Sequence, residues 1–185
     1  MGVNTMSYMW RACARQALET LAREGYRNFE VMAQCPHFDP FMERQEALAF
    51  GRFLRDAGLS VETINIPSLD QNLASGTPEM REHTVNVFKR LVDIANAHFI
   101  GEDAVAGLKA VAPKLGIVHL SDTGREAWRH DPVGQGSCDF AGFGAALKEI
   151  HYKKTSMLEI VSGEPLKDIV ASHQALVRWG WKALR

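Results

Sequence analysis

The stretch GIVHLSDTG, residues 116–124, begins as a buried strand and ends in polar side chains. Its apolar residues are strand formers, but His119 lies among them and the polar residues 121–123 follow directly. A second stretch, SMLEIVSGEP at 156–165, repeats the feature with Glu159 inside an apolar run. Because an unpaired buried carboxylate is costly, both stretches predict strands that carry a functional side chain near their C-terminal ends.

A repeated unit surrounds these two stretches: a helical pattern, a turn and then a short apolar strand. Strands are expected near 29–33, 60–66, 116–121 and 156–161, with GVNT at 2–5 as a possible short first strand. Helices are expected near 7–24, 41–57, 103–112, 140–150 and 166–179. Nearly continuous apolar strands are typical of parallel sheets covered on both faces. The alternation predicts one α/β domain over 1–185 with right-handed crossovers.

The middle of the chain is less regular. Thr77-Pro78-Glu79 indicates a helix start, and an amphipathic stripe continues from there to Ala95. At most one further strand, near ANAHFI at 95–100, fits before the strand at 116–121. The chain therefore has room for about five or six strands, whereas a closed eight-stranded barrel typically needs roughly 250 residues.

Composition narrows the class of protein. The chain is 46% hydrophobic and 23% charged, with a net charge of -1, which argues against a surface that coats nucleic acid. No apolar run reaches the length of a membrane span. The three cysteines are unclustered, which favours reduced thiols in the cytoplasm and gives no cysteine-based zinc site.

In parallel α/β folds, catalytic and binding residues usually lie at the C-terminal ends of the strands. His119 and Glu159 lie near such ends, and so does Glu30 in the FEVM strand. Oxygen and nitrogen ligands of this kind suit a divalent metal such as Mn, Mg, Co or Zn. The competing interpretation is that His119 is a hydrogen-bonded core residue, and burial of Glu159 is harder to explain in that way.

Several other polar residues have simpler explanations. Asp122 is expected to cap the loop that follows it, and Asp139 to cap the helix near 140. His37 in CPHFDP and His130 in RHDP are loop histidines. Either could line a site, but a position on the surface is the commoner explanation for a loop histidine.

Taken together, four segments resemble the xylose-isomerase-like TIM-barrel family of sugar phosphate isomerases and epimerases. The segments are EGYRNFEVM with PHFDP, INIPSLDQNLASGTPEMREHTV, KLGIVHLSDTGREAWRHDPVGQGSCDF and SMLEIVSGEP. The resemblance implies an incomplete (β/α) TIM-barrel-like parallel sheet of about five to six strands with helices outside, shortened in the middle.

The resemblance also implies roles for individual residues. His119, Glu159 and Asp93 would be metal ligands, with Glu159 also catalytic, and Arg125 and Asn96 would bind substrate. The match of Asp93 depends on its place in the fold: if the helix that begins at 78 continues through Asp93, the carboxylate cannot point into a barrel mouth. The family's first ligand Glu, which is also one of two acid/base carboxylates, has no equivalent here, nor do the fourth and fifth strands, which leaves an apparent gap between Arg90 and Gly101.

Three functions follow as expectations. The first is a sugar (phosphate) isomerase or epimerase that uses a divalent metal for proton transfer next to a carbonyl, in the cytoplasm, on a small sugar and with no nucleic acid or membrane partner. The second is a non-catalytic barrel fragment or assembly module. The third is an AP endonuclease-type DNA repair enzyme, which the near-neutral charge disfavours. Because an unclosed parallel sheet has two unpaired edges, a homo-oligomer is expected, and the alternative is an open sheet that helices shield.

Overall fold

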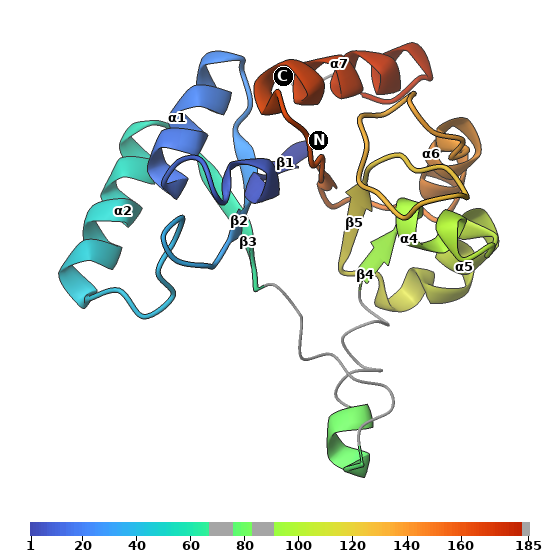
Figure 1. The fold of residues 1–185 in the computed structure, drawn as a ribbon, viewed down its shortest axis with the longest axis horizontal. Coiled ribbons are helices and arrows are strands. Elements are labelled where there is room, and N and C mark those ends of the chain that lie inside the picture. Colours follow the sequence, from blue (N-terminus) through green and yellow to red (C-terminus); the bar gives the residue numbers. More distant parts are fainter. Residues whose placement is uncertain (67–75, 83–90, 183–185) are drawn as a thin grey trace.

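Six parallel strands form a single sheet in the order β3-β2-β1-β6-β5-β4 (Figure 1). The structure is a computed structural model that describes residues 1–66, 76–82 and 91–182. The strands are β1 (Gly2–Asn4), β2 (Asn28–Met32), β3 (Ser60–Asn65), β4 (Leu91–Asp93), β5 (Ile117–Leu120) and β6 (Ser156–Leu158). The helices are α1 (Ala14–Arg23), α2 (Arg44–Asp56), α4 (Ile94–Phe99), α5 (Ala104–Val111), α6 (Phe140–Glu149) and α7 (Pro165–Arg178), with 3-10 turns at Thr5–Tyr8 and Ala112–Lys114.

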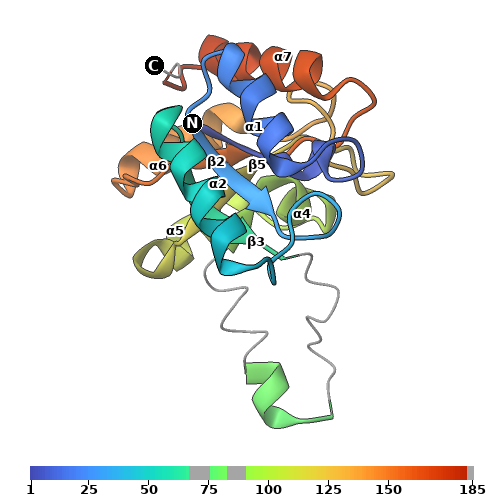
Figure 2. The same ribbon diagram turned by 90° about the vertical axis from the view of Figure 1, so that its left-hand side faces the viewer.

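The helices lie outside the sheet. Figure 1 shows α1 and α2 beside β2 and β3 on one flank, and α5 and α6 beside β4 and β5 on the other. Figure 2 shows α1 and α2 from the side, over the same two strands. Leu18 and Leu21 of α1 are fully buried in one apolar core with Phe29 of β2 and Leu158 of β6. The expected α/β fold is therefore confirmed as an incomplete TIM-barrel-like sheet.

The register aligns the C-terminal ends of the strands. Asn4 pairs with Glu30 across β1 and β2, and Asp93 pairs with His119 across β4 and β5. The strands that precede Glu159 and contain His119, β6 and β5, are neighbours, with Leu120 paired to Leu158. Polar residues from strands far apart in the sequence consequently lie at one level of the sheet.

The middle of the chain differs from expectation. The strand expected near ANAHFI is absent, because residues 94–99 form the helix α4. The strand in this region is instead β4, which lies directly before that helix. The helical stripe expected from Pro78 to Ala95 is interrupted by β4 at Leu91–Asp93, while 78–82 is helical and 83–90 lies outside the described residues. The Asp93 side chain explains the boundary, since its carboxylate accepts N–H bonds from Ala95 and Asn96 and so starts a new helix. The first helix also begins later than expected, at Ala14, after a 3-10 turn.

The sheet is open between β3 and β4. Among the described residues these two strands are its edges, and no strand is described between Asn65 and Leu91, so the gap lies before Leu91 and not between Arg90 and Gly101 as expected. Along β3, Ile64 is 56% exposed, and no residue of α2 is fully buried. The strand β3 is therefore an exposed edge of the sheet. Within the described residues no helix is long and apolar enough to cross a membrane.

The loop between β5 and α6 is organised by Asp122. Its carboxylate accepts N–H bonds from Thr123 at 2.9 Å, Gly134 at 2.8 Å and Cys138 at 3.1 Å. The backbone of Asp122 also pairs with Asp131 in an antiparallel bridge. Asp139 accepts one N–H bond, from Gly142, at the start of α6. Both capping predictions are confirmed, and the Asp122 contacts hold the loop that contains His130.

These two aspartates give a matched test of the loop. We expect Asp122→Ala to lower the free energy of unfolding by about 3 kcal/mol, because three backbone donors lose a charged acceptor. Asp139→Ala should cost only about 1 kcal/mol, as for a typical N-cap. Urea denaturation of both variants measures the difference, and equal losses would show that Asp122 does not organise the loop.

Candidate metal centre

Six buried polar side chains gather at the C-terminal ends of the strands. They are Asn4, Glu30, Asp93, His119, His130 and Glu159, and none is more than 8% exposed. They come from β1, β2, β4, β5, the loop after β5 and the residue after β6. A cluster of ionisable groups in a buried position is typical of a functional site.

His119 lies between two carboxylates. Its Nε2 is 2.7 Å from Glu30 Oε2, and its Nδ1 is 2.9 Å from Glu159 Oε2. Burial opposes charge on the imidazole, but the hydrogen bonds with Glu159 and Glu30 prevail and raise the pKa of His119 well above its usual value. Burial would likewise raise the pKa of Glu159, yet the contact with His119 lowers it. His119 and Glu159, which the sequence places near the ends of two different strands, thus converge in the fold.

Asn4 joins the two carboxylates from the other side. Its amide donates to Glu30 Oε2 at 2.6 Å and to Glu159 Oε1 at 3.2 Å. Its own Oδ1 accepts the N–H of Met6 at 2.8 Å, which fixes the orientation of the amide. The ends of β1, β2, β5 and β6 are thereby linked through side chains as well as through the sheet.

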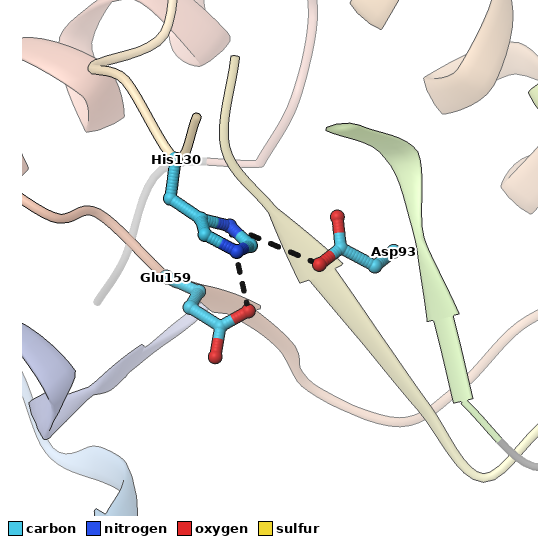
Figure 3. A group of neighbouring side chains, drawn as sticks. All are labelled: Asp93, His130 and Glu159. Carbon is cyan, nitrogen blue, oxygen red and sulfur yellow. Dashed lines mark ion pairs between the residues drawn. The ribbon is translucent and has the colours of Figure 1, made fainter. Parts of the chain in front are cut away.

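Asp93, His130 and Glu159 form the group that could hold an ion (Figure 3). One ligand atom from each lies within 4.8 Å of the others. His130 Nδ1 is 3.9 Å from Asp93 Oδ2 and 3.8 Å from Glu159 Oε2. Two ligands bound at 2.0–2.2 Å to one ion are about 3 to 3.5 Å apart, so a small contraction would place all three around a metal.

Asp93 is held as a ligand would need to be. It lies at the end of β4, which answers the question of strand or helix, and its Oδ2 accepts the side-chain N–H of Asn96 at 3.0 Å. Burial and the nearby charge of Glu159 raise the pKa of Asp93. An ionised Asp93 therefore costs free energy in the ion-free protein, and a cation beside it would relieve that cost.

The two predicted substrate residues lie near this group but outside its buried centre. Asn96 is exposed, and its Oδ1 also accepts a bond from the indole of Trp128. Arg125 is exposed on the loop after β5, with its guanidinium beside Gly101. Their roles in binding substrate stay predictions.

His130 was not expected in the site, and neither loop histidine lies on the surface. His130 Nδ1 is 2.8 Å from Ser121 Oγ, and its backbone carbonyl accepts the N–H of Val161, so two loops hold it. His37 is buried too, but it contacts Ala12 and Thr5 and has a structural role. The available signal for His130 was the pair of aspartates, 122 and 131, that closes the loop around it.

Comparison with known proteins agrees with this geometry. Residues 91–179, which supply β4, β5, β6 and the three side chains of Figure 3, match the family model described as xylose isomerase-like TIM barrel. The match covers just under half of the chain. The resemblance of the sequence to xylose isomerase-like barrels is thus confirmed. No curated protein gives a significant match to the sequence.

Solved structures of the same fold align with most of the chain. An L-ribulose 3-epimerase is 15% identical, with a TM-score of 0.63 over 97% of this chain and 93% of that chain. D-psicose 3-epimerase from Clostridium cellulolyticum H10 is 14% identical, with 0.62 over 99% and 90%. A xylose isomerase domain protein from Planctomyces limnophilus is 15% identical, with 0.68 over 88% and 91%. At these identities the likeness establishes the fold.

The raised pKa of His119 predicts a pH dependence of stability. A group whose pKa is higher in the folded state stabilises the fold below its unfolded pKa and loses that contribution as the pH rises through the folded pKa. In metal-free buffer, we therefore expect the free energy of unfolding to fall as the pH rises above neutral. His119→Gln should remove this dependence and His98→Gln, a substitution of a partly exposed histidine, should keep it. Denaturation curves across pH measure it, and an unchanged slope in His119→Gln would contradict the account.

Proposed function

We propose that this chain is a divalent-metal-dependent isomerase of small sugars or sugar phosphates. The supporting observation is the convergence of Asp93, His130 and Glu159 at the barrel mouth. The match to the xylose isomerase-like family model and the similarity in fold to sugar epimerases support a sugar substrate. Cys13, Cys35 and Cys138 are free, which supports a reducing, cytoplasmic setting.

The donor set fits a metal ion. Asp93, Glu159 and His130 offer oxygen and nitrogen ligands, which suit Mn, Mg, Co or Zn. His119 would be a fourth ligand through Nδ1, since its Nε2 contacts Glu30 and ligating histidines commonly donate their second N–H to a carboxylate. In this assignment His130 takes the place of the family's first Glu. When bound, the ion would polarise substrate oxygens and stabilise negative charge next to a carbonyl.

Glu159 is the proposed general base. Asn4 and His119 fix its two oxygens, and the contact with His119 keeps it ionised, as a base must be. Inversion at one carbon requires a proton donor on the face opposite the base, whereas transfer between neighbouring carbons can use one base. Glu159 alone could therefore serve an isomerisation, whereas an epimerisation would need a second group, for which Glu30 and Asp93 are the other buried carboxyls of the cluster.

Arg125 and Asn96 would bind the substrate beside this centre. The guanidinium of Arg125 can hold hydroxyl or phosphate oxygens in a bidentate contact. Asn96 connects to Asp93 on one side and Trp128 on the other. Substrate bound there would lie over the ligand group with its carbonyl end toward Glu159.

The alternative is a non-catalytic barrel that serves in assembly. The open edges at β3 and β4 and the absence of the family's first Glu favour it. The two candidates differ in one property: the isomerase requires a functional metal site, and the assembly module does not.

Metal binding and turnover test the proposal together. We expect Mn²⁺ to bind the wild-type protein with one site by calorimetry, and more weakly as the pH falls below the raised pKa of His119, because the proton on His119 competes with the metal. Glu159→Gln should reduce aldose–ketose turnover by about 100-fold or more and weaken Mn²⁺ binding. Glu149→Gln, far from the cluster, is the control. Absence of Mn²⁺ binding would exclude the isomerase and leave the assembly module.

We also propose that two copies associate through the open edges. Unpaired backbone donors and acceptors along a parallel edge favour pairing with another chain, and Ile64 and Ile66 are exposed there. Light scattering coupled to size exclusion should give a mass of twice 20.6 kDa. A stable 20.6 kDa monomer with cooperative melting would overturn this claim.

A further inference from the structure

A basic cavity lies at the end of the sheet opposite the candidate metal centre. It has a volume of about 440 Å³ and reaches Met1 before β1, Ser156 at the start of β6, and α6. The lining contains none of the residues of the metal centre. Volume of this size falls within the range of small-molecule sites.

The charged side chains that line this cavity are all basic. Lys148, Lys153, Lys154, Lys182 and His151 line it, and no acidic residue does, although the whole chain has a net charge of -1. Lys148 Nζ donates to the carbonyl of Gly180 and Lys154 Nζ to that of Leu115. Among the described residues none of the four lysines forms an ion pair. Burial and the nearby carboxylate of Glu62, which lies outside the lining, raise the pKa of Tyr152, but the basic side chains of the lining outnumber this carboxylate and favour an anion in the cavity.

His151 adds an independent observation. It has φ of 55° and is the only non-glycine residue with positive φ in the described part of the chain. It follows α6 in a Schellman motif, in which His151 N–H bonds to Lys148 O and Tyr152 N–H to Leu147 O. The same motif ends four other helices, and glycine takes the corresponding position each time: Gly25, Gly58, Gly101 and Gly180. An imidazole thus stands here where glycine would be easier to accommodate.

The cavity also has a rigid aromatic wall. Trp181 packs against Gly144, where an added Cβ would lie 2.8 Å from the indole nitrogen, and that nitrogen donates to the carbonyl of Phe140. The hydroxyl of Tyr152 donates to the carbonyl of Thr155. Because these polar groups are already paired, the rings are left to contact the apolar or aromatic part of a ligand.

We propose that this cavity binds a nucleoside monophosphate, with the phosphate on the lysines and His151 and the flat base against Trp181 and Tyr152. Lysine ammonium groups and an imidazole supply charge-assisted donors to phosphate oxygens. The base needs the π-face of an aromatic ring rather than specific hydrogen bonds. The site shares no residue with the metal centre, so its test does not depend on the proposed isomerase activity.

Calorimetry on the metal-free protein at low ionic strength tests the proposal with three probes. AMP should bind with one site, inorganic phosphate more weakly, and adenosine more weakly than AMP. Absence of saturable AMP binding, or equal binding of adenosine and AMP, would overturn the site. Equal binding of phosphate and AMP would retain an anion site and overturn the contact with the base.

Substitutions locate the binding. Lys153→Gln and Lys182→Gln should each weaken AMP by about tenfold, the loss expected for one hydrogen bond to a charged group. Lys167→Gln, at the exposed start of α7, should leave the affinity unchanged. If the three variants bind AMP equally, the phosphate does not lie in this cavity.

His151→Gly separates binding from folding. Because glycine suits the left-handed conformation, the variant should have a higher melting temperature than the wild-type protein, and it should bind AMP more weakly. A higher melting temperature with unchanged AMP affinity would remove His151 from the site, and a lower melting temperature would contradict the argument from the helix end.

Discussion

The contact of His119 with Glu30 and Glu159 is the interaction on which the candidate centre depends. Three ionisable side chains are buried there, and each would be costly alone. A charged imidazole between two carboxylates offsets that cost only if β2, β5 and β6 hold their register, because the two nitrogen contacts are 2.7 and 2.9 Å long. The cluster and the sheet therefore constrain each other, and the amide of Asn4 extends the constraint to β1.

Asp93, unlike the paired side chains of His119, Glu30 and Glu159, is a carboxylate whose ionised form is disfavoured in the fold. Its pKa is raised by burial and by Glu159, so the folded protein holds a carboxylate that is not fully compensated. Paired groups such as Glu30 and His119 stabilise the fold, while Asp93 and His130 stand nearly 4 Å apart without a strong contact. A buried carboxylate with a raised pKa beside an imidazole is the arrangement that a cation would complete, at some cost to the stability of the ion-free protein.

Much of this arrangement could be predicted from the sequence. His119 and Glu159 were identifiable because each interrupts an apolar strand, and the parallel fold brings strand ends together. The β4 strand was missed because three residues give no periodic signal, and the helical stripe from 78 overlaps them. His130 was missed because its burial depends on tertiary contacts, with Ser121 Oγ within the same loop and with the backbone of Val161 far along the chain, and the two aspartates that close the loop were the one local signal.

The central claim is that Asp93, His130 and Glu159 surround one metal ion, with His119 beside them. Crystals grown with Mn²⁺, measured at a wavelength where manganese scatters anomalously, test it most directly. The account predicts one strong anomalous peak within about 2.0–2.3 Å of ligand atoms from these residues. A peak elsewhere, or no peak in the cluster at saturating Mn²⁺, would contradict it.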